Sequence, residues 1–347
     1  MHYPILRELP VPAKHKTGWP WTEESERLQE KMPDGQPWPK MSIVTPSYNQ
    51  GRFIEETIRS VLLQGYPNLE YIIIDGGSTD NSVEIIKKYS PWLTYWVSES
   101  DRGQSHAINK GLAHCSGDIF NWINSDDLLC PSALRAVAAA WRKTSNSIIA
   151  GPVVDFKPDG TERIIAPNGL TMEKFLNIKK ARENSWIWHQ PGTYLPLSEV
   201  KMAGGVREEL RFTMDHFLMV DLLQRCNVVY IPELLAKFRL HNKSKTMTFG
   251  FCQFDLERVK ALRAMNGLEE YVTAKELKEE YISLLITIGA IARREGSKSL
   301  AFKYITKAIL LSPCLVMSEL LRRDFFRRLL RKLGRTFIRT SKNSADS

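Results

Sequence analysis

Three short polar clusters stand where apolar runs of the sequence end, and their side chains could bind a phosphate-bearing ligand and a metal ion. They occupy residues 46–49 (PSYN), 75–80 (DGGSTD) and 124–127 (NSDD). Each cluster alone also fits an ordinary turn, because Asn, Asp, Gly and Ser are common turn formers. If the preceding runs are neighbouring parallel strands, however, all three clusters converge on one crevice.

The chemistry of the three clusters is coherent. The Asp75 carboxylate can accept a hydrogen bond from the edge of a base or sugar, and Gly76 and Gly77 let such a ligand approach the backbone closely. Asp126 and Asp127 offer hard oxygen ligands for Mg²⁺ or Mn²⁺, which would balance the charge of a diphosphate leaving group. The chain contains no G-x-G-x-x-G or Walker loop, so we expect neither a dinucleotide site nor a P-loop.

Alternating strands and helices must position these clusters. Apolar and β-branched runs predict strands over residues 41–45, 69–75, 93–97, 119–124 and 147–151, and helical spacing predicts helices over residues 53–62, 80–89, 105–113 and 131–144. This alternation predicts a mostly parallel sheet with helices on both faces. Farther along, we expect a helix near 214–225, a strand near 228–231, and helices from about 253 onward, including one that ends at Arg294 and one over 298–311.

The ordered motifs resemble those of a known family. Residues 42–85, which contain SIVTPSYNQGRF and YIIIDGGSTDNS, residues 98–112 (SESDRGQSHAINKGL) and the NSDD cluster resemble family 2 glycosyltransferases of the GT-A type. The resemblance covers about 41–245 and points to bacterial enzymes of exopolysaccharide, capsule or lipopolysaccharide assembly. It implies an α/β fold with a Rossmann-like, mostly parallel sheet, followed here by a C-terminal helical appendage.

The resemblance also implies a role for each residue that matches a family motif. It places the nucleotide sugar against Pro46, Ser47, Tyr48, Asn49, Asp75, Gly76, Gly77, Ser78, Asp101, Arg102, Asp126, Arg239 and His241. It implies an Mn²⁺ or Mg²⁺ site at Asp126 and Asp127, with Asp127 as the more direct ligand. A fork-shaped arginine suits phosphate recognition, although an ordinary surface arginine fits position 239 as well.

Asp215 falls where this family places its catalytic base, although the Met-Asp-His sequence around it departs from the usual pattern. The alternatives for Asp215 are a helix N-cap and a surface acid, and Asp221, on another face of the same predicted helix, competes for the role. His189 either lines the acceptor side or is a core histidine. Two further histidines are expected to be structural, His106 and His114.

Together these assignments predict an inverting glycosyltransferase. It would move a sugar from a nucleotide-diphosphate donor to a hydroxyl of a saccharide or lipid-linked acceptor in cell-surface polysaccharide assembly, with Asp215 removing the acceptor proton. Two alternatives stay open: a catalytically inactive sugar-nucleotide-binding scaffold, and a nucleotidyltransferase, which also uses paired acids and a metal. The nucleotidyltransferase would more often carry a Gly-rich basic loop after its first strand, and PSYNQGRF matches such a loop poorly.

The positive charge of the chain lies in its C-terminal part. Of a net charge of +9, residues 301–347 contribute +8, from eleven Lys and Arg against three Asp and Glu. We therefore expect no nucleic-acid partner, and any anionic partner should meet the tail. Apolar side chains recur on one half of a helical wheel in this tail: Leu321, Phe325, Phe326, Leu329, Leu330, Leu333 and Phe337. The tail is either a helix packed on the body or an amphipathic helix on an anionic membrane surface.

Three parts and a cytoplasmic location are expected. An irregular arm covers residues 1–40, with Trp19, Trp21 and Trp38 as packing anchors, a glycosyltransferase domain covers 41–250, and a helical region covers 251–347. Five scattered cysteines without a CxxC pair argue against a disulfide framework or a zinc site, as is typical of a reducing cytosol. The chain begins without a secretory signal, and its longest apolar run has 12 residues, too few to span a bilayer. We expect a cytoplasmic protein, either soluble or peripheral at the inner face of the plasma membrane.

Overall fold

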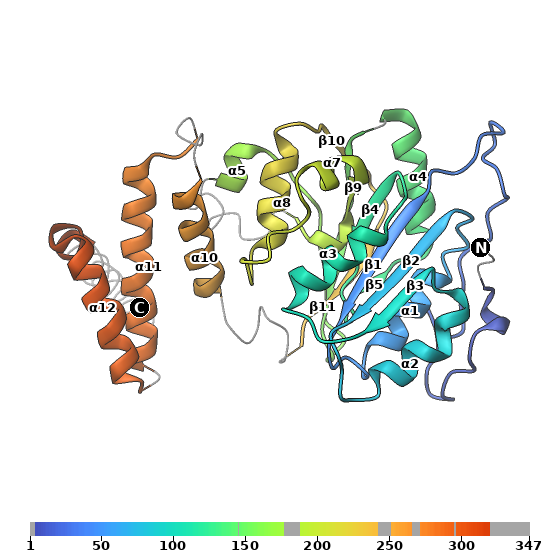
Figure 1. Ribbon diagram of the computed structural model, residues 1–347, viewed down its shortest axis with the longest axis horizontal. Helices are drawn as coiled ribbons and strands as arrows, with labels where there is room; N and C mark the ends of the chain where they lie inside the picture. Colours follow the sequence, from blue (N-terminus) through green and yellow to red (C-terminus); the bar gives the residue numbers. More distant parts are fainter. Residues whose placement is uncertain are drawn as a thin grey trace, which may run out of the picture. The chain divides into compact units, whose positions relative to one another are not determined.

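The computed structural model describes residues 4–144, 146–176, 188–241, 251–265, 271–294 and 296–319. The chain divides into two compact units, Met1–Thr248 and Phe249–Ser347. The first unit contains the strands, and the second unit is helical (Figure 1). The basic tail over 321–337 lies outside the described residues, so both readings of it stay predictions.

Seven strands form the central sheet of the first unit, in the order β10-β6-β9-β4-β1-β2-β3. Their bounds are β1 Met41–Ser47, β2 Leu69–Asp75, β3 Tyr95–Ser98, β4 Ile119–Trp122, β6 Ile148–Ala150, β9 Thr193–Pro196 and β10 Val228–Tyr230. β1 runs parallel to β2 and β4, and β2 runs parallel to β3, whereas β9 is antiparallel to both of its neighbours. The prediction of a mostly parallel sheet is confirmed.

Helices cover both faces of this sheet. Met41 and Ile43 of β1 pack in one core with apolar side chains of α1 (Ile54–Leu62), α2 (Ser82–Tyr89) and α4 (Ala133–Thr144). On the other face, Val44 lies so close to Gly111 of α3 (Gln104–His114) that a Cβ at position 111 would come within 2.5 Å of it. Every residue of β1 and β2 is buried. Burial on both faces explains why these strands read as nearly continuous apolar runs.

A second sheet, which the sequence does not predict, has the order β5-β11-β7-β8. Its strands are short: β5 Leu128–Leu129, β7 Val153–Phe156, β8 Glu162–Ile165 and β11 Ala236–Arg239. β11 pairs antiparallel with β5, where Ala236 faces Leu129, and parallel with β7. The described residues of this unit also form the helices α5 Met172–Leu176, α7 Leu197–Met202 and α8 Met214–Leu223, with short 3₁₀ turns at Leu6–Glu8, Ser90–Trp92 and Gln190–Gly192. The second sheet matters because β5 directly follows the NSDD cluster.

The N-terminal arm, residues 4–40 in the structure, packs on the first unit with little regular structure. Trp21 and Trp38 are 6% and 7% exposed, and the half-buried Trp19 packs against the same core. The predicted role of the three tryptophans as packing anchors is confirmed.

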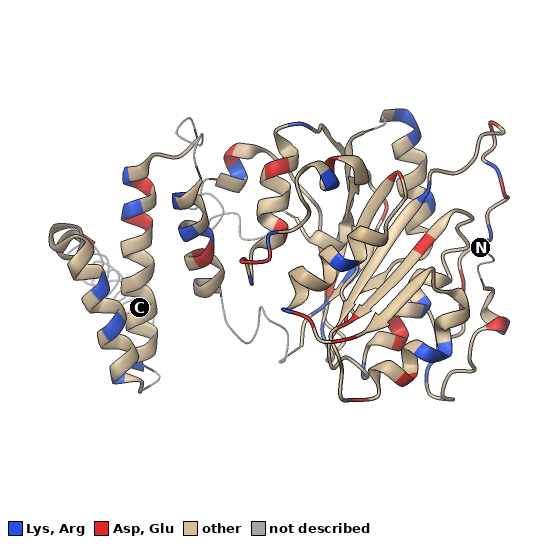
Figure 2. Cartoon of the chain, in the orientation of Figure 1, with Lys and Arg blue, Asp and Glu red and all other residues tan. Residues whose placement is uncertain are grey.

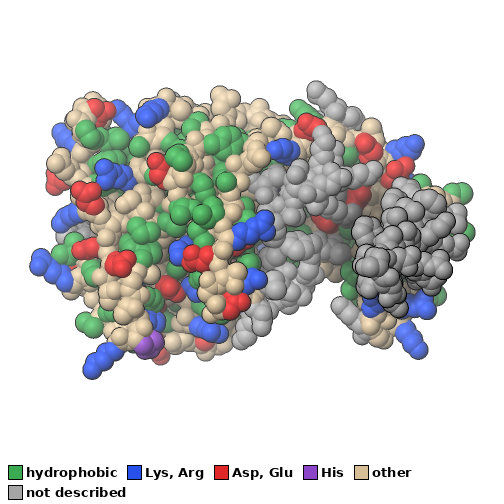
Figure 3. All heavy atoms as spheres, turned by 180° about the vertical axis from the view of Figure 1, so that it is seen from behind, with side chains coloured by type: hydrophobic (Ala, Val, Ile, Leu, Met, Phe, Trp, Pro, Cys, Tyr) green, Lys and Arg blue, Asp and Glu red, His purple; other side chains and the backbone are tan. Residues whose placement is uncertain are grey.

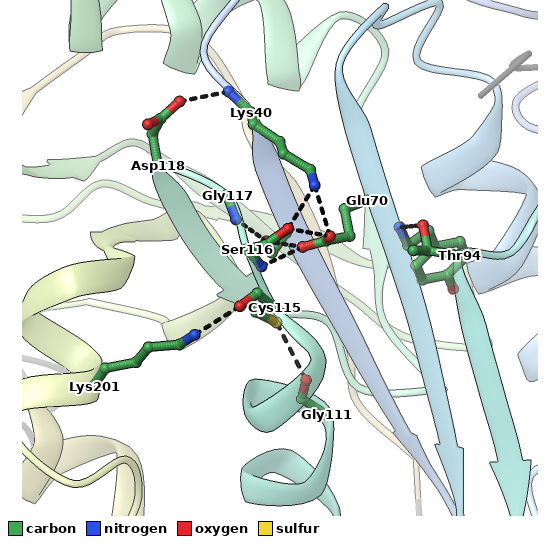
Figure 4. Close-up of polar contacts among 11 residues, drawn as sticks. Lys40, Glu70, Thr94, Gly111, Cys115, Ser116, Gly117, Asp118 and Lys201 are labelled. Carbon is green, nitrogen blue, oxygen red and sulfur yellow. Dashed lines mark hydrogen bonds and ion pairs between the residues drawn. The ribbon is translucent and has the colours of Figure 1, made fainter.

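A buried carboxylate ties together the amino ends of the central strands (Figure 4). Glu70 of β2 accepts hydrogen bonds from Ser116 N (2.7 Å), Ser116 Oγ (2.8 Å) and Ser42 Oγ, and pairs with Lys40 Nζ at 2.9 Å. Burial alone would raise the pKa of Glu70, but these hydrogen bonds outweigh it and lower the pKa. The network joins β1 and β2 to the turn between α3 and β4, at the edge opposite the three polar clusters.

The second unit contains α10 Phe251–Ala264, α11 Ala274–Arg294 and α12 Lys298–Leu311. The predicted helix end at Arg294 and the predicted helix over 298–311 are confirmed. Gly289 of α11 allows α12 to pack closely, since a Cβ there would lie 2.9 Å from Ile305. In the described part of the chain, no single helix is both long and apolar enough to cross a membrane. Among the described helices, the required length and apolar composition are reached only when α12 is combined with the helix Pro313–Glu319, across a bend of 117°.

Charged residues of the first unit lie mainly on helices and loops, and the strands of the central sheet contain few of them (Figure 2). Over the described part of the face in Figure 3, Lys and Arg side chains are intermixed with Asp and Glu on the first unit. This distribution matches the nearly balanced charge of the sequence before residue 301.

Candidate active site

The carboxyl ends of β1, β2 and β3 stand in register at one edge of the central sheet. Ser47 pairs with Asp75, and Asp75 pairs with Ser98. The buried Asp75 carboxylate accepts hydrogen bonds from Ser98 Oγ (2.7 Å), Ser78 N (2.8 Å), Ser78 Oγ (2.5 Å) and Gly77 N (3.2 Å). Through these hydrogen bonds, Asp75 fixes the backbone of residues 76–78, the glycine loop. Its predicted contact with a nucleotide base stays a prediction.

Hydrogen bonds join the three polar clusters. Asn49, in a left-handed conformation with φ 53°, donates its N–H to Ser78 Oγ (2.7 Å) and accepts from Thr79 N (2.8 Å) through Oδ1. Ser125 Oγ donates to the Pro46 carbonyl (3.0 Å), which links the NSDD cluster to the first cluster. The structure thus brings together the clusters that the sequence expects to converge.

The backbone around the glycine loop is tightly packed. Gly76 N donates to the Ser47 carbonyl (2.8 Å), and a Cβ on Gly76 would come within 2.5 Å of Asp101 Oδ2. Asp101 Oδ1 accepts from Gly103 N (2.7 Å). Ser47 Oγ is buried without a hydrogen-bond partner in the described part of the chain, and Tyr48 is 60% exposed. The Tyr48 side chain is therefore accessible to a ligand at this edge, whereas Ser47 Oγ is not exposed.

The two acids of the NSDD cluster differ in environment. Asp127 is buried: its Oδ1 accepts from Arg239 N (3.0 Å), its Oδ2 accepts from Asn124 Nδ2 (3.1 Å), and its carbonyl accepts from Thr57 Oγ1 (2.8 Å). Burial, together with the negative charge of Asp126, raises the pKa of Asp127 well above its usual range. The Asp126 side chain is 20% exposed and therefore faces the open side of the loop.

Pairing of β11 with β5 places Arg239 and His241 beside the two acids. Arg239 Nε donates to the Asp126 carbonyl (2.9 Å), and His241 Nε2 lies 2.9 Å from Asp126 Oδ2. Arg239 Nη2 also pairs with Glu56 Oε2 (2.7 Å), and its guanidinium lies over the rings of Phe53 and Phe156. Arg239 is therefore built into the site, and the alternative of an ordinary surface arginine is wrong.

The loop that begins α3 approaches the site from the other side. Gln104 Nε2 donates to Asn124 Oδ1 (2.6 Å), which joins this loop to the NSDD cluster. The Arg102 side chain is 70% exposed and pairs with Glu208 at 2.6 Å. The Arg102 side chain is thus paired with the segment between α7 and α8.

Asp215 and Asp221 lie on α8 in different surroundings. Thr213 is the N-cap of α8, so the N-cap alternative for Asp215 is wrong. Asp215 is half-buried and lines a small hollow with Trp122 of β4 and Trp188. Both carboxylate oxygens of Asp221 instead accept from Arg207 Nη2, at 2.9 and 3.0 Å. Asp221 is thus paired with Arg207, whereas Asp215 Oδ1 accepts a hydrogen bond from His216 N (2.8 Å).

Comparisons with known proteins agree with this geometry. A family model, glycosyl transferase family 2, matches residues 42–196. A protein of Nostoc sp. described as an uncharacterised glycosyltransferase is 30% identical over 280 residues, which cover 76% of this chain and 81% of the relative. Another, from Mycobacterium tuberculosis, is 30% identical over 207 residues, covering 58% and 75%. The chain belongs to glycosyl transferase family 2.

A solved structure shares the fold of this family 2 glycosyltransferase. The crystal structure of S. aureus TarS 1–349 in complex with UDP-GlcNAc matches it with a TM-score of 0.55 and 16% identity, covering 80% of this chain and 84% of TarS 1–349. At this identity the likeness speaks for the fold alone. The predicted GT-A architecture is confirmed.

The structure also decides the roles of three histidines in this family 2 glycosyltransferase. His189 is buried, stacks on Phe238 and lies 3.0 Å from Asp155 Oδ1, as the core-histidine reading requires. His106 Nδ1 accepts from Arg102 N (3.2 Å), and His114 stacks on Tyr95. The structural roles expected for His106 and His114 agree with these contacts.

Four side chains at the start of α1 contact the site but were not predicted from the sequence. They are Phe53, which precedes the helix, and Glu56, Thr57 and Ser60 within it. Their spacing of three and four residues places them on one helical face, directly after the first polar cluster. That spacing is the signal that could have found them.

Proposed function

We propose that this protein is an inverting glycosyltransferase that moves a sugar from a nucleotide-diphosphate donor to a hydroxyl acceptor. The observation that carries the proposal is the joining of three strand-end clusters, at Asn49–Ser78 and Ser125–Pro46, on the carboxyl edge of parallel β1, β2 and β4. In parallel sheets this edge is where ligands bind. The S. aureus TarS structure with UDP-GlcNAc shows that a protein of this fold takes a nucleotide sugar.

The acidic residues of the site fit a divalent metal. Two adjacent carboxylates, one of them buried with a raised pKa, form a charge that a cation would balance. The sequence makes Asp127 the more direct ligand. The geometry instead favours Asp126, because both Asp127 oxygens already accept hydrogen bonds while Asp126 is partly exposed beside His241. When bound, Mn²⁺ or Mg²⁺ would stabilise the charge of the departing diphosphate.

The protein would supply only part of the metal's coordination. In the described part of the chain, no group of three or more His, Cys, Asp and Glu side chains is arranged to hold a metal. Hard cations bound through one or two carboxylates usually take further ligands from substrate phosphates. We therefore propose that metal and donor bind together, and that Asp126 and His241 are the residues that would hold the metal.

In the proposed reaction, the acceptor hydroxyl attacks the anomeric carbon as the bond from that carbon to the diphosphate oxygen breaks. Asp215 takes the hydroxyl proton, and the electron pair of the broken bond leaves with the diphosphate. A single displacement of this kind inverts the anomeric carbon. Asp215 is supported because it falls where the family resemblance places the base and lies at the hollow lined by Trp122. The competing Asp221 forms a structural pair with Arg207.

The test is a screen of nucleoside-diphosphate sugars with the full chain and Mn²⁺ or Mg²⁺. We expect calorimetry to show metal-dependent binding of one donor, and a coupled assay to show slow release of the nucleoside diphosphate. Asp126→Asn should lose the metal dependence, whereas Asp159→Asn, on an exposed turn, should keep it. Binding of no nucleotide sugar, or unchanged metal dependence in Asp126→Asn, would overturn the proposal. Pyrophosphate release from a nucleoside triphosphate and a sugar phosphate would instead support the nucleotidyltransferase.

We also propose a lipid-linked saccharide acceptor, in polysaccharide assembly at the inner face of the plasma membrane. The second unit supports this location, because α12 exposes Phe302 (73%) and Leu310 (81%) near Lys303 and Lys307. An apolar face bordered by lysines suits an anionic lipid surface. Sedimentation with anionic vesicles should be lost in Phe302→Ser/Leu310→Ser and at high salt. Equal sedimentation of variant and parent would exclude α12 as the contact.

A further inference from the structure

The N-terminal arm is not explained by the family assignment, since the family match begins at residue 42. Arg59 of α1, which is fully buried, anchors the arm. Its Nε donates to the Pro20 carbonyl (3.0 Å), Nη1 to the Pro10 carbonyl (3.0 Å) and Nη2 to the Trp21 carbonyl (3.1 Å). The planar fork of an arginine can serve three carbonyls at once, which holds two separate parts of the arm against α1.

The same anchored segment contacts the backbone that carries the acidic residues. Trp19 Nε1 donates a 2.8 Å hydrogen bond to the carbonyl of Leu129, which is fully buried two positions after Asp127. The N–H of Leu129 donates to Ser60 Oγ (3.1 Å). Both backbone polar groups of Leu129 are therefore bonded to side chains, one from α1 and one from the arm.

The neighbouring carbonyls of this segment depend on α1. The Asp127 carbonyl accepts from Thr57 Oγ1 (2.8 Å), and the Cys130 carbonyl accepts from Gln64 Nε2 (2.9 Å). The Leu129 carbonyl, which lies between them, accepts from Trp19, a residue outside the family-matched segment. A buried carbonyl without a donor is unfavourable, so loss of the indole N–H should let β5 shift. Because β5 pairs with β11, such a shift would move Asp126 and Arg239 together.

We propose that the N-terminal arm is a positioning element of the active site. In this role, Trp19 holds residues 124–127, the acidic loop, in place through Leu129. Arg59 fixes the arm, Trp19 fixes β5, and β5 fixes Asp126 and Asp127. The proposal rests on the metal-dependent function proposed above, because its effect on function is measured as Mn²⁺ binding at the acidic residues.

The chain offers a matched control for the test. Trp38 Nε1 also donates a 2.8 Å hydrogen bond to a backbone carbonyl, that of Gln29, but this bond stays within the arm. Trp19→Phe and Trp38→Phe therefore remove the same kind of donor, and only the first removes one from the acidic loop. A benzothienylalanine at position 19, which replaces the indole N–H by sulfur, provides the same test if Trp19→Phe fails to fold.

Two readouts are measured on the full chain. Hydrogen exchange of a peptide covering residues 124–131, without metal, should be faster in Trp19→Phe than in the parent and unchanged in Trp38→Phe. Mn²⁺ binding, measured by electron paramagnetic resonance of free Mn²⁺ in the presence of UDP or GDP, should be about 10-fold weaker in Trp19→Phe only. A loss of this size is typical when a residue that supports a metal ligand is replaced.

The outcomes separate this proposal from the proposed function. Equal exchange and equal Mn²⁺ affinity in Trp19→Phe, Trp38→Phe and the parent would overturn the positioning role of Trp19. If Asp126→Asn keeps the parent's Mn²⁺ affinity, the proposed metal site is wrong, and the exchange measurement still decides whether Trp19 holds the loop. Equal losses in both tryptophan variants would show a general role in stability and would also overturn the proposal.

Discussion

The Arg102 guanidinium is bound by Glu208, with Nη2 at 2.6 Å and Nε at 3.2 Å from Glu208 Oε2. Asn109 of α3 donates to the other oxygen of Glu208 (3.3 Å) and to the Val206 carbonyl (2.8 Å). An arginine that the family resemblance assigns to the donor is thus paired with the segment that leads to α8 and Asp215. The pair connects the loop before α3 with the segment that leads to α8.

Glu208→Gln should strengthen binding of the nucleoside diphosphate, because a donor phosphate would no longer compete with a carboxylate for Arg102. Solvent screens this exposed pair, so we expect an effect of only about two- to five-fold in Kd. Calorimetry with UDP and GDP checks the prediction, and Glu209→Gln at the neighbouring exposed position is the control. Weaker binding in Glu208→Gln would mean that Glu208 orients Arg102 for the donor.

The contribution of Asp127 to metal-free stability should fall as pH rises, because burial beside Asp126 raises the pKa of Asp127. A carboxyl with a raised pKa in the folded state contributes stability below its unfolded value of about 3.9, and that contribution is lost as pH rises through the folded pKa. The positive charge of Mn²⁺ held at Asp126 would favour the deprotonated form of the neighbouring Asp127, so the stabilising effect of Mn²⁺ should grow over the same rise. Thermal melts in chelator and in Mn²⁺, from about pH 4 to pH 8, test this. A Mn²⁺ effect that does not vary with pH would contradict it.

Asp215→Asn should abolish sugar transfer and leave donor binding nearly unchanged, because proton removal contributes only in the transition state. A loss of at least about 100-fold in single-turnover rate is expected. Donor Kd by calorimetry and single-turnover transfer on the same preparation make the comparison.

Asp221→Asn serves as the matched carboxylate on the same helix. It should transfer sugar at close to the parent rate but melt at a lower temperature, since it weakens the half-buried pair with Arg207. Transfer that survives in Asp215→Asn and fails in Asp221→Asn would show that the base is Asp221.

Asp75→Asn should weaken nucleotide binding through the glycine loop. Ser98 Oγ, Ser78 N and Gly77 N all donate to Oδ2, and Ser78 Oγ donates to Oδ1. The change replaces one of these two oxygens by a donor, so at least the hydrogen bond from Ser78 Oγ is lost. Each buried donor left without an acceptor costs about 1–3 kcal/mol. Ser98→Ala, which removes one of these donors and keeps the carboxylate, should have the smaller effect on Kd. The same Kd for Asp75→Asn and the parent would exclude a role for this loop in binding.

The sequence by itself determined the strands of the central sheet except β9, the helices α1 to α4 that cover it, and the family. Strands such as β1 and β2, and helices such as α12, follow from apolar runs and helical spacing, which are local properties of the chain. Once those strands were expected to be parallel, the convergence of residues 46–49, 75–80 and 124–127 followed, because parallel strands end at the same edge. The family motifs lie within these same segments, so they are also readable from the sequence.

Only the tertiary structure decided how the site is completed. The β5–β11 pairing brings Arg239 and His241 to Asp126, and a two-residue strand leaves no pattern in the sequence. Which acid of the NSDD pair faces outward depends on the burial of Asp127 under α1. The partner of Asp221 is Arg207, and the donor for the Leu129 carbonyl is Trp19. These contacts join residues far apart in the chain, and the packing of the folded state selects each partner from many of the same chemical type.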